Sequence, residues 1–180
     1  MIHLPACRQA GILSFEIGNY AMRTALYPGS FDPVSLGHID LIKRATRIFD
    51  RVVVGVARNL HKKPLFTNEE RMVMLKEAVK GIERVEVLAF DGLVVDFARK
   101  KDIHVLIRGL RMISDFEYEF QMALTNRRFA EDIETIFLMP SEQFSFLSST
   151  LLKESAALGA DISMFVPRCV EDKLKERLAQ

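Results

Sequence analysis

The sequence predicts an α/β fold, with a parallel sheet of five strands in a single domain. Short runs rich in β-branched residues alternate with helical patterns along most of the chain. Such alternation is typical of parallel sheets that helices cover on both faces, with right-handed crossovers. The run 51–57 is almost wholly apolar, as expected for a strand buried on both faces. The length of 180 residues fits one domain, so we expect a Rossmann-like, doubly wound arrangement.

The expected elements follow one another in a regular order. Strands are expected at 23–27, 51–57, 84–89, 103–107 and 134–139. Helices are expected at about 38–49, 67–80, 93–101, 114–129, 148–158 and 167–178. Thr67 with Glu70, and Ser114 with Glu117, have the spacing of a capping box, which marks the start of a helix. Pro167 stands at the first position of the last helix, where a missing N–H is tolerated.

The beginning of the chain differs from the rest. It contains a proline and two glycines and shows little hydrophobic periodicity. We expect residues 1–21 to form a disordered N-terminal extension, with Met22 as the natural start and 22–180 as the folded domain. Arg8 interrupts the weakly apolar beginning, so a secretory signal peptide is not expected.

Composition and charge exclude several classes of protein. Hydrophobic residues make up 49% and charged residues 27%, a balance unlike that of a disordered chain. No apolar run approaches the ~18 residues that a membrane-spanning helix needs. The net charge of +1 gives no overall field for nucleic acid or for a membrane surface, so neither is expected as a partner. The two cysteines, Cys7 and Cys169, cannot form a disulfide framework and indicate a reducing cytoplasm.

The residues that carry chemistry follow the strands. In a parallel α/β sheet, ligands bind outside the carboxyl ends of the strands, so the segments after the five strands should meet at one edge. These segments are 28–38, 58–64, 90–94, 108–111 and 140–150. They supply a histidine at a helix start, lysines, two arginines and a cluster of hydroxyls, which are groups that bind a polyphosphate. The first segment has neither the P-loop pattern nor the glycine spacing of dinucleotide-binding folds.

Several motifs in these segments resemble one known family. They are Tyr-Pro-Gly-Ser-Phe-Asp-Pro at 27–33, Gly37-His38, Lys62-Lys63-Pro64, Arg-Gly-Leu-Arg at 108–111 with Asp-Phe-Glu-Tyr-Glu at 115–119, and Ser-Phe-Leu-Ser-Ser-Thr at 145–150. In this order they resemble the bacterial phosphopantetheine adenylyltransferases of the nucleotidylyltransferase superfamily, from about Met22 to the C-terminus. Ser35 departs from the superfamily pattern, which usually has Thr or His there, but it keeps a hydroxyl.

The resemblance implies an enzyme that transfers the adenylyl group of ATP to 4′-phosphopantetheine. The products are dephospho-coenzyme A and pyrophosphate, in the penultimate step of coenzyme A biosynthesis. A phosphate nucleophile has a second pKa of ~6 and is mostly ionised at neutral pH, so no general base is needed. The expected mechanism is in-line attack without a covalent intermediate, helped by positioning and by electrostatic stabilisation of the transition state.

The resemblance also implies roles for individual residues. The catalytic residues would be Ser30, His38, Lys62 and Arg111. ATP would be bound by Ser30, Phe31, His38, Gly109, Leu110, Arg111, Glu119, Phe144, Ser145, Phe146, Leu147, Ser148, Ser149 and Thr150. The substrate 4′-phosphopantetheine would be bound by Ser30, Lys62, Val94 and Arg108. Mg²⁺ would be held mainly by the ATP phosphates. No protein ligand to a metal is assigned, and Asp32 is equally well explained as a turn residue. His61 and His104 are expected to be structural or surface residues.

Two other functions use the same residue types. A sister nucleotidylyltransferase would act on nicotinate mononucleotide or a polyol phosphate, although the Arg108–Arg111 motif with Glu119 argues against it. A module that only senses ATP would not need the lysine and the second arginine, which favour a second anionic substrate. The resemblance further implies a homohexamer, a dimer of trimers, and coenzyme A as a feedback inhibitor. The sequence itself shows that the helix 114–129 has more apolar surface than one core face needs.

Overall fold

The structure is a computed structural model that describes residues 22–58 and 64–178. The expected extension 1–21 lies outside the described residues, and so does Lys62. Within the described ranges, none of the helices has the length and apolar character needed to cross a membrane.

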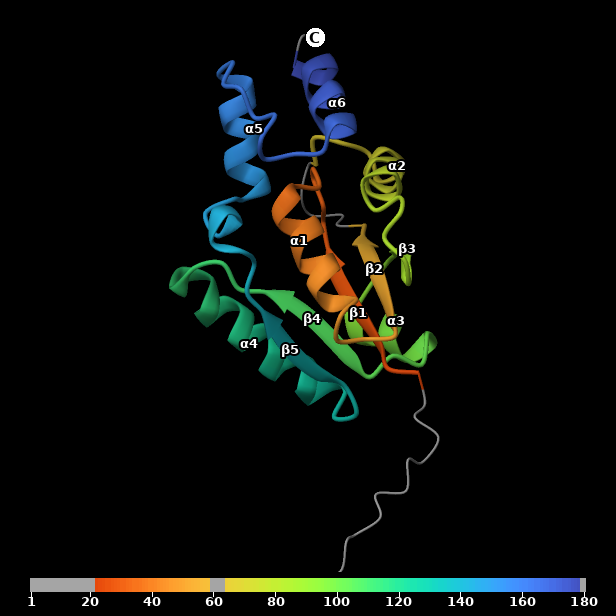
Figure 1. The fold of residues 1–180 in the computed structure, drawn as a ribbon. Coiled ribbons are helices and arrows are strands. Elements are labelled where there is room, and N and C mark those ends of the chain that lie inside the picture. The colour runs from red at the N-terminus through yellow and green to blue at the C-terminus, as the bar shows by residue number, and fades with distance from the viewer. Residues whose placement is uncertain (1–21, 59–63, 179–180) are drawn as a thin grey trace, which may run out of the picture.

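Five parallel strands form one sheet at the centre of the fold (Figure 1). They are β1 (Thr24–Gly29), β2 (Arg51–Ala57), β3 (Val85–Phe90), β4 (Val105–Gly109) and β5 (Glu134–Leu138). Their order across the sheet is β3-β2-β1-β4-β5, and every neighbouring pair is parallel. The predicted fold class is therefore confirmed. The winding reverses between β1 and β4, and such a switch point leaves a crevice at the carboxyl ends of the strands.

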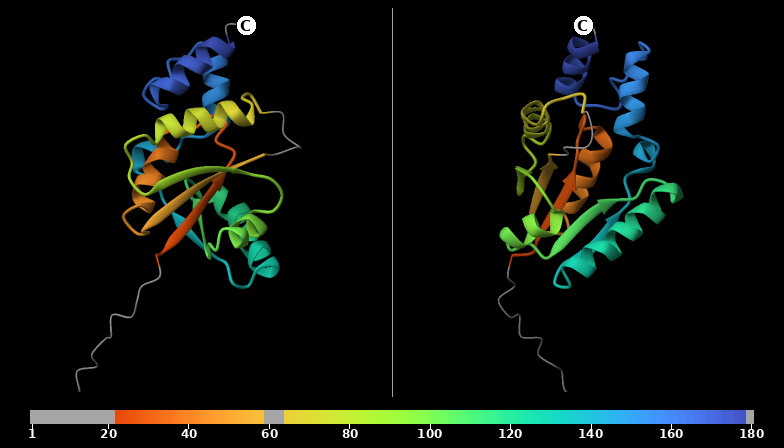
Figure 2. Two further views of the ribbon diagram at one scale, coloured as in Figure 1. Left: turned by 90° about the vertical axis from the view of Figure 1, so that its right-hand side faces the viewer. Right: turned by 180° about the vertical axis from the view of Figure 1, so that it is seen from behind.

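Helices cover both faces of the sheet and its carboxyl edge (Figures 1 and 2). They are α1 (Leu36–Ala45), α2 (Asn68–Ala78), α3 (Val94–Lys100), α4 (Ile113–Phe129), α5 (Ser149–Ala157) and α6 (Arg168–Leu178), with a short 3₁₀ helix, η1 (Glu142–Phe144), before α5. α1 and α2 pack on one face, and α3 and α4 on the other. α5 and α6 pack against each other beyond the carboxyl ends of the strands.

Side-chain alternation along the central strands divides the core into two layers. Tyr27 and Val54 belong to the larger layer, which includes residues of α1, α2, α5 and α6. Leu26 and Val53, their neighbours in sequence, belong to the smaller layer beneath α3. Successive side chains of a strand point to opposite faces, so an uninterrupted apolar strand serves both layers. The apolar run in β2 is explained in this way.

Two helix starts test the capping patterns. The Thr67–Glu70 capping box is present at the start of α2, with both of its reciprocal hydrogen bonds. The capping box expected from Ser114 is wrong, because α4 already begins at Ile113, with Met112 as its cap and no side-chain hydrogen bond there. Spacing alone therefore identified one helix cap and misplaced the other by two residues.

The first strand and the first helix approach each other more closely than expected. β1 continues to Gly29 because it stays paired with β2 as far as Val56. α1 begins at Leu36 rather than at residue 38, because Ser35 caps it. The connection between them is therefore short, and its residues are held close to the edge of the sheet.

A substitution at Leu106 tests the smaller core layer. Leu106 in β4 is fully buried, so Leu106→Ala leaves a cavity and should lower the free energy of unfolding by about 2–5 kcal/mol. Leu158→Ala is the control at a position that is 89% exposed, and it should change the free energy by less than about 0.5 kcal/mol. Urea unfolding followed by circular dichroism measures both. Equal losses in the two variants would contradict the assigned core.

Candidate active site

A pocket of roughly 340 Å³ opens at the carboxyl ends of β1 and β4, where the winding reverses. Its lining consists of Tyr27, Pro28, Gly29, Ser30, Phe31, Ser35, Gly37, His38, Leu41, Arg108, Gly109, Arg111, Glu119, Pro140, Phe144, Leu147, Ser148, Ser149 and Thr150. The first, fourth and fifth of the segments that follow the strands thus meet as expected, whereas the third, 90–94, lies outside the lining. His38 shares this pocket with both Arg108 and Arg111.

Most of the predicted site residues line this pocket. They are Ser30, Phe31, His38, Arg108, Gly109, Arg111, Glu119, Phe144, Leu147, Ser148, Ser149 and Thr150. Leu110, Ser145 and Phe146 are outside the lining, although their neighbours belong to it. Val94 begins α3 and packs against the smaller core layer, away from the lining. The prediction for Lys62 concerns a residue outside the described ranges.

His38 is held by the residue that caps its own helix. The Oγ atom of Ser35 accepts a hydrogen bond from the backbone N–H of His38 at 3.4 Å. In return, the backbone N–H of Ser35 donates to Nδ1 of His38 at 3.0 Å, where a Glu side chain accepts in an ordinary capping box. Nδ1 is therefore an acceptor, and the proton of the neutral ring lies on Nε2. The cap fixes both the orientation and the tautomer of the imidazole.

The surroundings of His38 keep its ring neutral. Burial, followed by the positive charges of Arg111 and Arg108, lowers the pKa of His38 to about 4. The ring of Phe31 packs edge-on against the imidazole, with 5.1 Å between the ring centroids. Phe31 also has a left-handed φ of 48°, a conformation that is uncommon for a bulky residue and recurs at functional sites. At neutral pH His38 is therefore an uncharged hydrogen-bond donor in the pocket wall.

Arg108 is paired with an acid from α4. Its Nε and Nη2 atoms donate to the two carboxylate oxygens of Glu119, at 2.7 and 2.6 Å. Its Nη1 atom donates to the carbonyl oxygen of Pro28 at 2.9 Å. A two-pronged pair of this kind is strong and directional, so the guanidinium has a fixed orientation. The carboxylate of Glu119, which the resemblance assigns to the nucleotide, holds this arginine in the structure.

Arg111 joins the fourth segment to the fifth. Its Nε atom donates to Asp115 at 3.0 Å, and its Nη1 atom donates to the carbonyl oxygen of Leu147 at 2.6 Å. The pair with Asp115 is about one third exposed, which leaves it more open to exchange than the pair of Arg108. Arg111 thus links the fourth segment both to α4 and to the fifth segment.

Asp32 ties the first segment to two others. Its carboxylate accepts hydrogen bonds from the N–H groups of Leu65 and Phe66, both at 3.0 Å, and from Nζ of Lys153 at 2.7 Å. Burial alone would raise the pKa of Asp32, but the hydrogen bonds from Lys153 and the two amides outweigh it and lower the pKa. With both oxygens engaged, Asp32 acts as a tether between the first segment, the start of α2 and α5.

Gly109 allows α1 to lie against the fourth segment. A Cβ atom at this position would stand 2.5 Å from Cδ1 of Leu41, far inside the contact distance. Leu41 lies on α1, one turn beyond His38. The glycine of the Arg-Gly-Leu-Arg motif is therefore explained by packing that brings His38 and the arginines to one pocket.

Sequence reasoning missed the groups that hold the pocket together. The spacing of Ser35 and His38 at a helix start was the one local signal for their reciprocal bonds. Asp40 of α1 accepts from the backbone N–H and the Oγ of Ser141, at 2.7 and 2.9 Å, and so anchors the fifth segment. These two residues are 101 positions apart, and no pattern in the sequence links them. Tyr27 was also missed, and burial raises the pKa of its hydroxyl.

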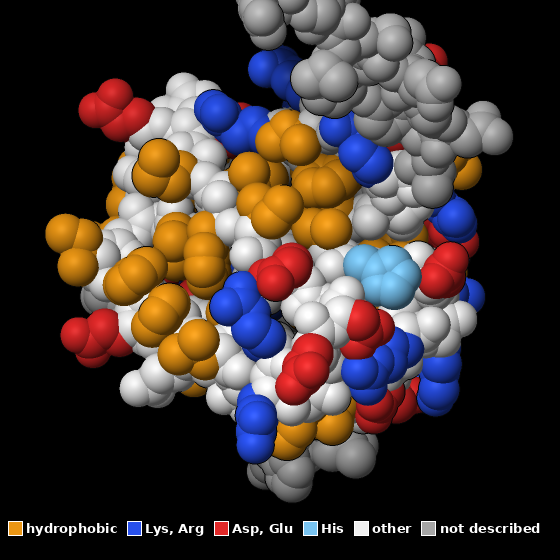
Figure 3. All heavy atoms as spheres, turned by 90° about the horizontal axis from the view of Figure 1, so that it is seen from below, with side chains coloured by type: hydrophobic (Ala, Val, Ile, Leu, Met, Phe, Trp, Pro, Cys, Tyr) orange, Lys and Arg blue, Asp and Glu red, His pale blue; other side chains and the backbone are white. Residues whose placement is uncertain are grey.

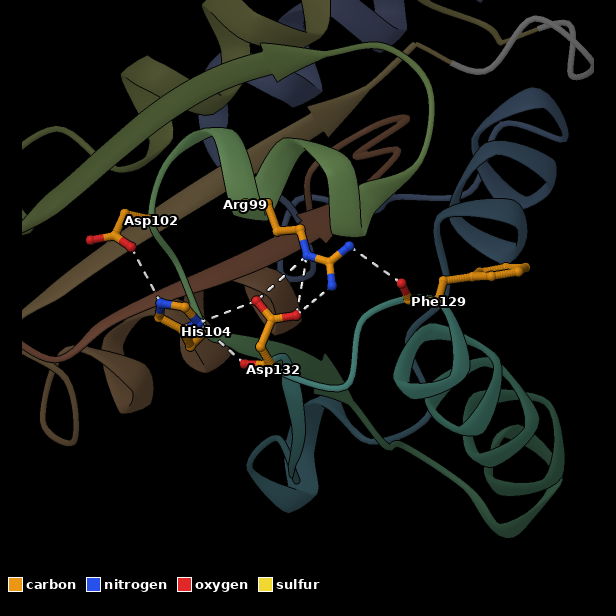
Figure 4. Close-up of polar contacts among 5 residues, drawn as sticks. All are labelled: Arg99, Asp102, His104, Phe129 and Asp132. Carbon is orange, nitrogen blue, oxygen red and sulfur yellow. Dashed lines mark hydrogen bonds and ion pairs between the residues drawn. The ribbon is translucent and has the colours of Figure 1, made fainter.

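The other described histidine, His104, lies at the amino end of β4, whereas the pocket lies at the carboxyl ends of the strands. Figure 4 shows its polar contacts. His104 stands just before β4, with Nε2 at 3.3 Å from Asp102 and Nδ1 at 3.7 Å from the carboxylate of Asp132. Asp132 is also the partner of Arg99. This exposed cluster is remote from the pocket, so His104 is a surface residue.

Fold and pocket together define a class of protein. The sequence profile of the cytidylyltransferase-like family matches residues 26–155, and the chain belongs to this family. A solved structure described as a putative nicotinate-nucleotide adenylyltransferase from Vibrio parahaemolyticus has the same fold. It superposes with a TM-score of 0.62 at 20% identity, covering 88% of this chain and 95% of that one. At so low an identity the likeness concerns the fold alone.

Two curated relatives are much more similar in sequence. The phosphopantetheine adenylyltransferase of Caldanaerobacter subterraneus subsp. tengcongensis is 53% identical over 156 residues, which cover 87% of this chain and 98% of the relative. That of Gloeobacter violaceus is 56% identical over 155 residues, covering 86% and 96%. Within its family, the chain therefore belongs to the phosphopantetheine adenylyltransferases, as the motifs predict.

The neutral state of His38 predicts a pH dependence of stability. In the unfolded chain His38 takes up a proton below its ordinary pKa of about 6.5, whereas in the folded protein its pKa is about 4. Acid therefore favours the unfolded state and lowers the free energy of unfolding. One such proton contributes at most about 1.4 kcal/mol per pH unit. His38→Gln removes this contribution, and its free energy of unfolding should fall less than that of the wild type between about pH 7 and pH 5.

Urea unfolding across this pH range measures the effect. Leu158→Gln is the control, because it changes a position that is 89% exposed and removes no titratable group. The control should keep the wild-type pH dependence. If His38→Gln also kept the wild-type pH dependence, the imidazole of His38 would not be held neutral in the folded protein.

Proposed function

We propose that this protein transfers the adenylyl group of ATP to 4′-phosphopantetheine, giving dephospho-coenzyme A and pyrophosphate. This is the penultimate step of coenzyme A biosynthesis. The observation that carries the proposal is the identity of 53% and 56% to phosphopantetheine adenylyltransferases along nearly their whole length. The pocket supports it independently, because it gathers His38 and two arginines where two anionic substrates would meet.

ATP is proposed to place its phosphates between the first segment and the start of α5. Ser30 and His38 reach the α-phosphate from the first segment, and Arg111 binds the phosphates from the fourth. At α5, Ser148 caps the helix by accepting from the N–H of Leu151 at 3.0 Å. Other N–H groups in this first turn point towards incoming oxygens, and the helix dipole favours negative charge there.

The remaining predicted residues are assigned to the nucleotide and to the second substrate. The nucleotide is lined by Phe31, Gly109, Leu110, Glu119 and residues 144–150. The substrate 4′-phosphopantetheine is held by Lys62, Val94 and Arg108, together with Ser30. The side of the pocket near Arg108 would then receive the attacking phosphate.

The chemistry requires two anions to approach each other. The attacking phosphate has a second pKa of ~6 and is already ionised, so no residue has to act as a base. One of its oxygens forms a bond to the α-phosphorus of ATP in line with the bond to pyrophosphate, which breaks without a covalent intermediate. His38 donates through Nε2–H to the charge that develops on the α-phosphate, while Lys62 and Arg111 contribute positive charge.

Mg²⁺ is proposed to bind mainly through oxygens of the ATP phosphates. The described residues contain no group of three His, Cys, Asp or Glu side chains placed to hold a metal ion. Asp32, the acid of the first segment, is engaged by Lys153 and two amides. Mg²⁺ commonly keeps several waters and takes substrate phosphates as ligands, which fits this donor set. When bound, the ion supplies further neutralisation of the triphosphate.

A turnover assay tests the proposed function. The protein is incubated with ATP, Mg²⁺ and 4′-phosphopantetheine, and pyrophosphate and dephospho-coenzyme A are measured. We expect both products in equal amounts. Product formed only with nicotinate mononucleotide would indicate the sister enzyme, and ATP binding without turnover would indicate a sensor. Either result would overturn the proposal.

His38→Ala should lower kcat at least about a hundredfold, because it removes a donor to the charge of the transition state. The affinity for ATP should change little, since the lost interaction forms mainly in the transition state. Steady-state kinetics and calorimetric titration with ATP measure the two quantities. His104→Ala is the control and should behave as the wild type. An unimpaired His38→Ala variant would remove this residue from the mechanism.

An exposed apolar face on α4 supports assembly of several copies. Phe116 and Phe120 stack with 5.5 Å between their ring centroids, yet they are 46% and 45% exposed. Tyr118, Leu124 and Phe129 are exposed on the same helix. Hydrophobic side chains gather on the side of the molecule where α4 lies (Figure 3). Large exposed apolar patches mark interaction surfaces, and we assign this one to the homohexamer, a dimer of trimers.

Phe120→Glu should weaken this assembly, because it places a charge in the centre of the proposed contact. Sedimentation velocity at micromolar concentration should give a hexamer for the wild type and smaller species for the variant. Leu158→Glu is the control, since it adds the same charge at an exposed position beyond α4. A wild-type protein that sediments as a monomer would contradict the assignment.

Two further proposals follow from the same reaction. We place it in the cytoplasm, where coenzyme A is made. Coenzyme A should inhibit by feedback, because it resembles the product and would occupy both halves of the pocket.

A further inference from the structure

Arg71 is a buried cation that the proposed mechanism leaves unused. It lies near the start of α2 and is 3% exposed. Its Nη1 atom donates to the carbonyl oxygens of Ser30, at 2.6 Å, and Ala57, at 3.0 Å. Its Nη2 atom donates to Oδ1 of Asn68 at 3.4 Å. One guanidinium therefore joins the ends of β1 and β2 to α2.

The position of these two carbonyls gives the contact its importance. Ser30 follows β1 directly and lines the pocket. Ala57 is the last residue of β2, and Arg71 lies in α2, the next element along the chain. The guanidinium thus joins the end of β2 to Ser30 at the edge of the sheet where the pocket opens. A shift of Arg71 would move both Ser30 and the end of β2.

The charge of Arg71 has little direct compensation. Among the described residues, no carboxylate oxygen hydrogen-bonds to the guanidinium, and its buried Nε atom has no partner. Burial lowers the pKa of Arg71, and Asp32 and Glu69 oppose this only through space. Burying an unpaired charge is expensive, whereas a neutral donor would be enough to bind a carbonyl. A positive charge kept behind Ser30 therefore points to an anion on the other side.

We propose that Arg71 is a positioning residue for adenylyl transfer. It holds Ser30 and the end of β2 in place, and it adds positive charge behind the phosphate site without touching substrate. This inference rests on the proposed function. It assigns a specific task to a residue that lies outside the pocket lining.

A positioning role and a purely structural role have different consequences. If Arg71 only stabilised the fold, its loss would lower the melting temperature, and the remaining folded protein would have normal kinetics. If it positions Ser30 and the end of β2, the folded variant itself is slower. A small misplacement of groups around a reacting centre is enough to reduce the rate strongly.

Two variants of Arg71 and one control separate these roles. Arg71→Met removes the charge and the hydrogen bonds, whereas Arg71→Lys keeps the charge but loses the fork that binds two carbonyls. Arg99→Met is the control, because Arg99 pairs with Asp132 at the opposite end of the sheet. Circular dichroism and thermal melting give the folded fraction, to which all rates are normalised.

We expect Arg71→Met to lower kcat by about tenfold to a hundredfold. Arg71→Lys should recover part of the loss, and Arg99→Met should match the wild type. Wild-type kcat and KM in folded Arg71→Met would overturn the inference. If Arg71→Met does not fold, the same comparison is made with Arg71→Lys.

Hydrogen–deuterium exchange supplies a readout that does not depend on activity. The N–H of Arg58, next to Ala57, donates to the carbonyl of Phe90 at 3.0 Å and should exchange faster in both Arg71 variants than in Arg99→Met. Unchanged exchange in the Arg71 variants would overturn the positioning role. A wild-type protein that makes no dephospho-coenzyme A would overturn the proposed function, and the exchange data would still decide whether Arg71 holds this edge.

Discussion

Carbonyl groups at the carboxyl ends of parallel strands need hydrogen-bond donors once the strands diverge, and arginine side chains provide them in this protein. Arg108 donates to the carbonyl of Pro28, and Arg71 donates to those of Ser30 and Ala57. Buried carbonyls are rarely left without a donor, so these contacts meet a requirement of the fold itself. The same guanidiniums also place positive charge at the edge of the sheet where ligands bind. One set of groups thus closes the fold and prepares the pocket for anions.

Burial and this positive edge together keep His38 uncharged. Burial lowers the pKa of His38 most, and the charges of Arg111 and Arg108 act in the same direction. The ring therefore adds no charge to the pocket, and its contribution is a hydrogen bond whose direction Ser35 fixes. The arginines thus carry the positive charge of the pocket, and the imidazole carries a hydrogen-bond donor of fixed direction.

The acids of the pocket keep these cations in place before a substrate arrives. Glu119 holds Arg108, and Asp115 holds Arg111, so no guanidinium has to be ordered at the moment of binding. The Arg108 pair is more buried, and breaking it would leave two charges without partners, whereas the more exposed Arg111 pair exchanges at lower cost. The two arginines therefore differ in how firmly they are held, Arg108 by a more buried pair and Arg111 by a more exposed one.

Local patterns in the sequence determined the class of fold, the alternation of strands and helices, and the segments that meet at the pocket. They could do so because side-chain periodicity reports burial, and because the carboxyl ends of parallel strands share one edge. The sequence also revealed the cap formed by Thr67 and Glu70, whose partners are three residues apart. Only the tertiary structure decided that Asp32 meets Lys153, 121 residues away, and that Arg71 reaches back 41 residues to Ser30. Such contacts depend on how separate elements pack against one another, and no spacing along the chain encodes that geometry.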